Sequence, residues 1–163
     1  MRLALFEPDI AQNTGTLVRI GASLGVGLDI IEPCGFPWGA SAFKRAGMDY
    51  IPLAEVIRHD SWEDFLKRRP STGRLILLTT SSAEPYTGFE YRSDDTLLLG
   101  RETAGVPTHV HERADARVTI PMRPPARSLN VAIAAAMVLG EGLRQTAGFP
   151  PVTSAPETDG GGI

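Results

Sequence analysis

The sequence predicts a single α/β domain built on a parallel sheet. Its 163 residues, 42% of them hydrophobic, are enough for one buried core and too few for two ordinary domains. Segments typical of strands and of helices alternate along the chain, which is the pattern of α/β folds. The runs Leu75–Leu78 and Thr96–Leu99 are apolar without alternating polarity. Such runs are expected of strands that are buried on both faces of a parallel sheet.

The other elements follow from turn and cap signals. Further strands are expected at residues 2–7, 28–31 and 117–120, and helices at residues 12–24, 41–46 and 61–69. Asn13 or Thr14 is placed to cap the first helix, and Gly25 to end it in a left-handed conformation. Ser61 is expected to cap the third helix, which must stop before Pro70.

The last helix, at residues 128–145, has no polar face through its middle, because residues 131–139 are all apolar. A helix that is apolar all round must be covered all round. One small sheet covers a single side, so this helix predicts a homodimer; the alternative is complete burial in the core of the monomer. Residues 149–163 are rich in Pro, Gly, Ser and Thr and predict a disordered tail beyond a domain at residues 1–148.

Composition restricts the classes of function. The net charge of -3 gives no general attraction for nucleic acid, so an RNA site would need a local basic patch. Candidate patches, which are more often plain solvated surface, are Lys44-Arg45, Arg58-His59, Lys67-Arg68-Arg69 and the pair Arg123 and Arg127. No apolar run is long enough for a membrane span, and Glu7 and Pro8 interrupt any signal-like segment, so a cytosolic location is expected.

Metal and disulfide chemistry have little support in the sequence. Cys34 is the only cysteine, so an internal disulfide cannot form and a zinc site would lack ligands. His109 and His111 lie two residues apart, which on a helix directs them to different faces. No dinucleotide or phosphate-loop fingerprint is present, since Gly21, Gly25 and Gly27 have the wrong spacing.

Three polar segments with glycine or proline lie beside the ends of strands. They are residues 13–19 with Asn13 and Arg19, residues 99–107 with Gly100 and Glu102, and residues 120–122 followed by 127–130 with Ile120, Ser128 and Asn130. The second and third fall at the carboxyl ends of strands, where ligands of open α/β sheets bind. Each also has an ordinary structural explanation. Asn13 and Ser128 could serve merely as helix caps, Gly100 could serve merely to make a turn, and Arg19 could be a solvated helix residue. Asn13 and Arg19, six residues apart, are expected on related sides of one helix.

Taken together and in this order, these segments resemble the three motifs of the SpoU family of RNA 2′-O-methyltransferases, in the SPOUT superfamily. The resemblance covers residues 2–145. Residues 6–15 (Phe-Glu-Pro-Asp-Ile-Ala-Gln-Asn-Thr-Gly), 31–36 and 45–50 look like the subgroup that methylates cytidine or uridine at the wobble position 34 of tRNA. One departure is Arg101, which stands where the second motif usually has proline; it adds a candidate contact to phosphate or substrate.

The resemblance implies a parallel-sheet α/β fold with a deep trefoil knot, in a single minimal domain. It also implies S-adenosylmethionine as methyl donor, with S-adenosylhomocysteine as product and no metal. The cofactor would be held largely by main-chain groups, at positions that match Leu78, Gly100, Ile120, Met122, Ser128 and Leu129. Gly100 would permit close backbone approach.

The family positions for catalysis match Arg19, Asn13, Glu102, Ser128 and Asn130. A guanidinium stays protonated in proteins, so Arg19 is interpreted as a stabiliser of the developing alkoxide or as a clamp on the adjoining phosphate. Ser128 and Asn130 would position the ribose hydroxyl and the cofactor, and Glu102 would orient Arg19 or a loop donor. The expected partners are tRNA and a second copy of the chain.

Alternative functions remain open from the sequence. An ordinary doubly wound nucleotide enzyme is disfavoured by the missing fingerprints. A knotted RNA-binding module without catalysis is disfavoured because all five candidate catalytic residues are present. A 2′-O-methyltransferase acting on another tRNA or rRNA site is the nearest alternative.

Overall fold

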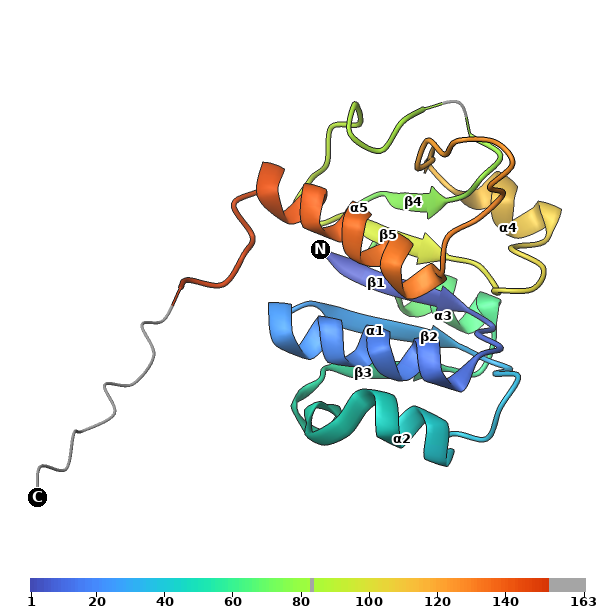
Figure 1. The fold of residues 1–163 in the computed structure, drawn as a ribbon, viewed down its shortest axis with the longest axis vertical. Coiled ribbons are helices and arrows are strands. Elements are labelled where there is room, and N and C mark those ends of the chain that lie inside the picture. Colours follow the sequence, from blue (N-terminus) through green and yellow to red (C-terminus); the bar gives the residue numbers. More distant parts are fainter. Residues whose placement is uncertain (83, 153–163) are drawn as a thin grey trace, which may run out of the picture.

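A six-stranded parallel sheet forms the centre of the protein in the computed structural model, which describes residues 1–82 and 84–152 (Figure 1). The strands are β1 (Arg2–Phe6), β2 (Gly27–Ile31), β3 (Val56–His59), β4 (Leu75–Leu78), β5 (Thr96–Leu99) and β6 (Ala116–Val118). The helices are α1 (Ala11–Leu24), α2 (Ser41–Gly47), α3 (Trp62–Arg68), α4 (Thr108–Arg113) and α5 (Val131–Gln145), with a 3-10 helix at Met48–Leu53. The fold class predicted from the sequence is confirmed.

The strand order is β3-β2-β1-β5-β4-β6, so the direction in which the chain builds the sheet reverses beside β1. Every pairing between these strands is parallel. The carboxyl ends of β1, β4 and β5 therefore lie along one edge of the sheet, and the loops that follow them meet there. Ligands of open α/β sheets bind at such an edge.

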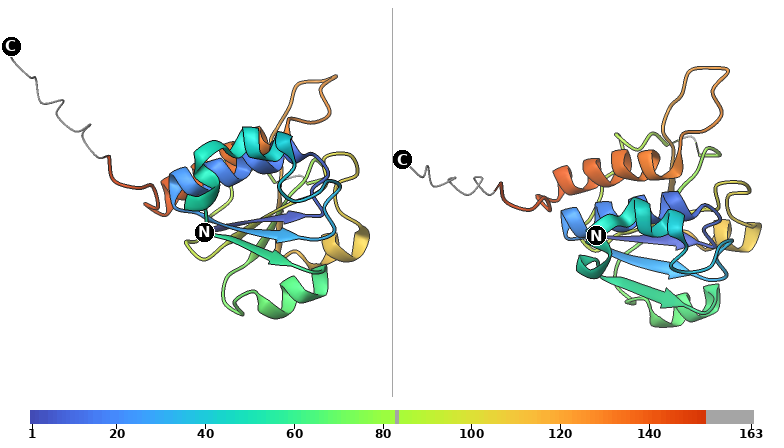
Figure 2. Two further views of the ribbon diagram at one scale, coloured as in Figure 1. Left: turned by 90° about the horizontal axis from the view of Figure 1, so that it is seen from below. Right: turned by 60° about the horizontal axis from the view of Figure 1, so that its bottom comes forward.

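The side chains of the central strand alternate between two hydrophobic clusters, one on each face of the sheet. Leu3 and Leu5 pack in the cluster that includes α1 and α5, whereas Ala4 and Phe6 pack in the cluster that includes Trp62 of α3. Figure 2 shows α1, α2 and α5 together on one face, with α3 on the other. Burial on both faces explains why β4 and β5 are apolar without alternation.

Three residues or residue pairs were expected to cap or end a helix, and two of these expectations are confirmed. Gly25 ends α1 in the left-handed region, with φ of 68°, and the Ser61 hydroxyl caps α3 by accepting from the Asp64 amide at 3.2 Å. The expected cap of α1 is wrong. The helix begins one turn earlier than expected at its N-cap Ile10, which makes no side-chain cap bond, so Asn13 lies inside the helix and its side chain is free for other contacts.

Other elements differ from the sequence-based expectation. The last helix begins at Val131, three residues later than expected, because Asn130 caps it: its side-chain oxygen accepts from the Ala132 amide at 2.9 Å and the Ile133 amide at 3.3 Å. The last strand ends at Val118 rather than at residue 120. Strand β3 and helix α4 were not expected at all.

Helix α5 is covered on one side only within the protomer. Ala135, Val138 and Leu139 are fully buried against the sheet and α1, whereas Ile133 is 57% exposed and Met137 is 38% exposed. Burial in the monomer core therefore accounts for one face of the helix and leaves an apolar strip on the other. The predicted tail lies outside the described residues from residue 153 onward; its first residues, 149–152, are exposed.

Within residues 1–82 and 84–152, no helix is long and apolar enough to cross a membrane.

Candidate functional site

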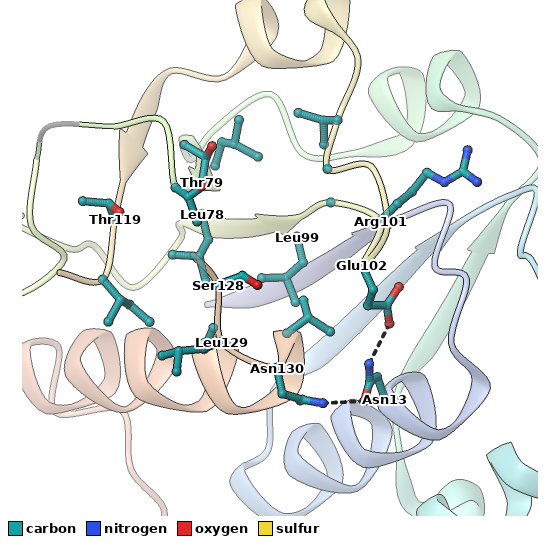
Figure 3. Close-up of a pocket in the computed structure, with 18 of the residues that line it drawn as sticks. Asn13, Leu78, Thr79, Leu99, Arg101, Glu102, Thr119, Ser128, Leu129 and Asn130 are labelled. Carbon is teal, nitrogen blue, oxygen red and sulfur yellow. Dashed lines mark hydrogen bonds between the residues drawn. The ribbon is translucent and has the colours of Figure 1, made fainter. Parts of the chain in front are cut away.

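A cavity of about 440 Å³ opens at the edge of the sheet where β4 and β5 end. Its floor is made by Leu77, Leu78 and Leu99, the last residues of these two strands, and its walls come from the loops after β5 and β6 and from the start of α5 (Figure 3). Ile10 and Asn13 close one side. A cavity lined by apolar side chains and several polar groups is typical of a site for a small organic molecule.

This cavity brings together residues that are far apart in the sequence and that the motifs had singled out. Of the candidate site residues, those that line it are Asn13, Leu78, Gly100, Glu102, Ile120, Met122, Ser128, Leu129 and Asn130. Arg19 does not line it.

Polar side chains at one end of the cavity form a hydrogen-bonded chain (Figure 3). The side-chain Nδ2 of Asn130 donates to Oδ1 of Asn13 at 2.9 Å, and Nδ2 of Asn13 donates to Oε1 of Glu102 at 3.1 Å. Asn130 also caps α5, so its oxygen must accept and its nitrogen must point toward Asn13. This requirement decides which atom donates in each of these hydrogen bonds, from Asn130 to Asn13 and from Asn13 to Glu102, so Glu102 is the last acceptor.

Glu102 is also paired with Asp9, which follows β1. The backbone N–H of Asp9 donates to Oε2 of Glu102, and the backbone N–H of Glu102 donates to Oδ1 of Asp9, both at 3.1 Å. The Thr103 hydroxyl donates to Oδ2 of Asp9. Burial raises the pKa of Glu102, and its hydrogen bond with Asp9 raises it further. The same hydrogen bond lowers the pKa of Asp9 to about 2. When the two carboxyl groups share a single proton, that proton therefore resides on Glu102 and Asp9 is ionised.

The loop after β5 is closed by its own backbone. The Arg101 amide donates to the Gly105 carbonyl at 2.9 Å, and the Gly105 amide donates back at 2.8 Å. A Cβ on Gly100 would lie 2.7 Å from the Gly105 carbonyl carbon, and Gly105 itself has φ of 65°. The glycine at position 100 is thus required by the loop itself, in addition to any approach by a ligand.

Arg101 lies at the rim between this cavity and a second cleft on the α3 side of the sheet edge. Its guanidinium is 3.5 Å from Glu7 and 3.8 Å from Asp9. Figure 3 shows the side chain extending away from Asn13 and Asn130. Within one protomer, Arg101 therefore interacts with the carboxylates that follow β1 and not with the amide chain.

Arg19 lies apart from the cavity. Its side chain is exposed on α1, and its guanidinium is 5.0 Å from the centre of the Tyr50 ring. The expectation that Arg19 and Asn13 share related sides of α1 is wrong. Six residues correspond to a rotation of about 240° around a helix, so a buried Asn13 leaves Arg19 turned away.

Several lining residues escaped the sequence analysis. Thr79, Thr80 and Thr119 follow buried strands, and that position could have identified them. Asp9, which does not line the cavity, also follows a buried strand, but its pairing with Glu102 and Thr103 joins residues more than 90 positions apart and has no local signal. Cys34 offers no reactive thiolate, since burial raises its pKa to about 12.

Relatives of this chain are named for one activity. A protein of Beijerinckia indica subsp. indica, named tRNA (cytidine(34)-2′-O)-methyltransferase, is 57% identical over 155 residues, which cover 94% of this chain and 97% of the relative. A protein of the same name from Escherichia coli K12 is 37% identical over 152 residues, which cover 92% and 96% of the two chains.

Solved structures agree with this likeness. One, described as giving structural insights into the 2-OH methylation of C/U34 on tRNA, superposes with a TM-score of 0.84 at 37% identity, covering 88% of this chain and 94% of the other. An AdoMet-bound rRNA methyltransferase from Sinorhizobium meliloti superposes with a TM-score of 0.79 at 28% identity, covering 88% and 55%. The profile of the SpoU rRNA Methylase family matches residues 1–140, and the chain belongs to that family.

Proposed function

We propose that this protein is a tRNA (cytidine(34)/uridine(34)-2′-O)-methyltransferase, which transfers a methyl group from S-adenosylmethionine to the ribose 2′-hydroxyl of the wobble nucleotide. One observation carries the proposal: the candidate residues of three separate motifs line a single cavity, in a chain 57% identical over most of its length to a protein named for this reaction. We assign the catalytic domain to residues 1–148, a tail to residues 149–163, and the reaction to the cytoplasm.

The cavity fits S-adenosylmethionine in size and in the character of its walls. Its volume, about 440 Å³, falls within the range of small-molecule sites. Leu78, Ile120 and Leu129 offer apolar surface for an adenine ring, and the backbone at Gly100 and Met122 offers main-chain groups beside it. Ser128 adds a hydroxyl for the polar part of the molecule. No metal is part of this proposal; the described residues contain no cluster of His, Cys, Asp or Glu that could hold one.

The bound cofactor supplies a methyl group that is already activated by a sulfonium. The protein must therefore orient the 2′-hydroxyl and accept or stabilise the charge that develops as its proton leaves. Asn130 and Ser128 would orient the hydroxyl at the mouth of the cavity. Arg19 would stabilise the developing alkoxide or hold the adjoining phosphate, and tRNA would bind over exposed basic residues near the cavity, including Arg123 and Arg127.

A homodimer reconciles Arg19 with this role. Within one protomer Arg19 lies outside the cavity, and the apolar strip formed by Ile133 and Met137 on α5 lies uncovered. We infer that a second copy covers this strip and that Arg19 of one copy reaches the cavity of the other. Exposed apolar strips of this kind commonly mark an interface between subunits.

The substrate can be tested in cells. Mapping 2′-O-methylated nucleotides in tRNA from cells that lack the protein should show loss at position 34 alone, with recovery when the gene is returned. Loss at another tRNA position or in rRNA, with position 34 unchanged, would replace the proposed substrate while leaving the methyl transfer intact.

A further inference from the structure

Arg101 is ion-paired with the carboxylates of Glu7 and Asp9, and one of its N–H donors makes no hydrogen bond. Its Nε is buried and has no hydrogen-bond partner among the described residues. The distances to Glu7 and Asp9, 3.5 Å and 3.8 Å, are those of ion pairs and not of close hydrogen bonds. The guanidinium thus acts on both carboxylates mainly through its charge.

The surroundings of this guanidinium are acidic. Glu7 and Asp9 pair with Arg101, and Asp9 contacts Glu102. The charged or titratable groups across the second cleft are Asp60, Glu63, His109 and Glu32, the last of which is paired with Arg58. Arg101 is the cation paired with Glu7 and Asp9. A phosphate bound here would face this negative field, so the position suits a charge that balances the carboxylates better than one that binds RNA.

The effect of Arg101 passes along the hydrogen-bonded chain. The backbone N–H groups of Asp9 and Glu102 each donate to the carboxyl group of the other residue. Glu102 also accepts from Asn13, and Asn13 accepts from Asn130. We propose that Arg101 is a positioning residue: its ion pairs with Glu7 and Asp9 hold Asp9 in place, so that Glu102 keeps the orientation that aligns Asn13 and Asn130 for methyl transfer. The catalytic part of this inference rests on the proposed function.

The direction of the pH effect follows from the charges. The pKa of Asp9 is lowered to about 2 mainly by its hydrogen bond with Glu102, and the charge of Arg101 makes the smallest contribution. Without that positive charge, the pKa of Asp9 rises and the pair takes up a second proton at a higher pH. The hydrogen-bonded arrangement of Asp9 and Glu102 would then be lost at a higher pH in the variant than in the wild-type protein.

The kinetic test compares Arg101→Gln, which removes the charge, with Arg101→Lys, which keeps it. Arg144→Gln is the matched control, because Arg144 forms an exposed ion pair with Glu141 on α5, away from the cavity. Arg101→Gln should lower kcat about two- to fivefold. KM for tRNA and Kd for S-adenosylmethionine should stay unchanged, and Arg101→Lys should keep a kcat close to that of the wild-type protein.

An unchanged kcat for Arg101→Gln would overturn the proposal. If KM for tRNA also rose and its salt dependence weakened, Arg101 would be an RNA contact instead.

A second measurement does not depend on methyl transfer. Asp9, whose folded pKa is lowered, contributes stability above its ordinary value of 3.8, and that stability is lost as the pH falls toward about 2. Arg101→Gln should therefore lower Tm at neutral pH, and the difference from the wild-type protein should vanish in acid. A difference that is constant with pH would refute the inference. This readout remains valid even if the protein methylates no tRNA, so failure of the proposed function and failure of this inference can be told apart.

Discussion

The exposed side chain of Arg19 can be explained in two ways, and replacing it distinguishes them. As a solvated helix residue, its replacement by alanine would change stability by less than about 0.5 kcal/mol and activity hardly at all. As a stabiliser of the developing alkoxide, its loss should lower the rate of transfer by about 10²–10³, while folding and binding of S-adenosylmethionine stay normal.

Arg19→Lys is expected to rescue little, because an ammonium cannot reproduce a planar, two-pronged contact. Single-turnover methylation, measured beside cofactor binding by calorimetry, checks both variants. Near-normal transfer by Arg19→Ala would refute the catalytic role. Loss of cofactor binding would show that Arg19 belongs to a different part of the site.

Helix α5 depends on Asn130 for its start, and the cavity depends on the same residue for its alignment. Asn130→Ser retains a side-chain oxygen that can cap the helix but removes the amide that donates to Asn13. We expect unfolding free energy close to wild type and a clear loss of transfer. Asn130→Ala should lose transfer and also about 1 kcal/mol of stability.

The control for this pair is Ser61→Ala, which removes the cap of α3 on the other face of the sheet. It should lose a similar amount of stability, measured by urea unfolding, and keep its activity. If Asn130→Ser transfers methyl groups at the wild-type rate, the hydrogen bond to Asn13 has no part in alignment.

The elements that could be predicted from the sequence are those whose signal is local. The buried runs of β4 and β5 are uniformly apolar, and Ser61 and Gly25 mark helix ends by their own chemistry. Strand β3 was missed because Val56–His59 is a mixed segment at the edge of the sheet, where half of its side chains are exposed. Helix α4 was missed because it buries only Val110.

The site divides in the same way. Asn13, Glu102 and Asn130 could be selected because they lie in motifs that resemble a known family. Their hydrogen bonds, the pairing of Glu102 with Asp9 and the outward direction of Arg19 depend on contacts across the fold. No local pattern in a single sequence carries that information.

At the scale of the whole molecule, the family's fold implies the trefoil knot, and the proposed dimer makes a specific claim about how two copies share their sites. Arg19→Ala and Glu102→Gln should each be inactive alone. When the two variants are mixed and allowed to exchange subunits, one site in each mixed dimer would combine an intact Arg19 with an intact Glu102.

Activity should then return to about a quarter of the wild-type level, because half of the dimers are mixed and half of their sites are intact. Sedimentation should show dimers for every sample. A mixture that stays inactive although its subunits have exchanged would place Arg19 and Glu102 in the same protomer's site, and a stable, active monomer would exclude the dimer.

The central claim is methyl transfer to one hydroxyl, and a chemically defined RNA tests it most directly. Purified protein would be incubated with labelled S-adenosylmethionine and either tRNA or the same tRNA carrying a 2′-deoxy nucleotide at position 34. The account predicts labelling of the first and none of the second, with the label on the ribose of nucleotide 34. Equal labelling of both, or binding of tRNA without any transfer, would contradict it.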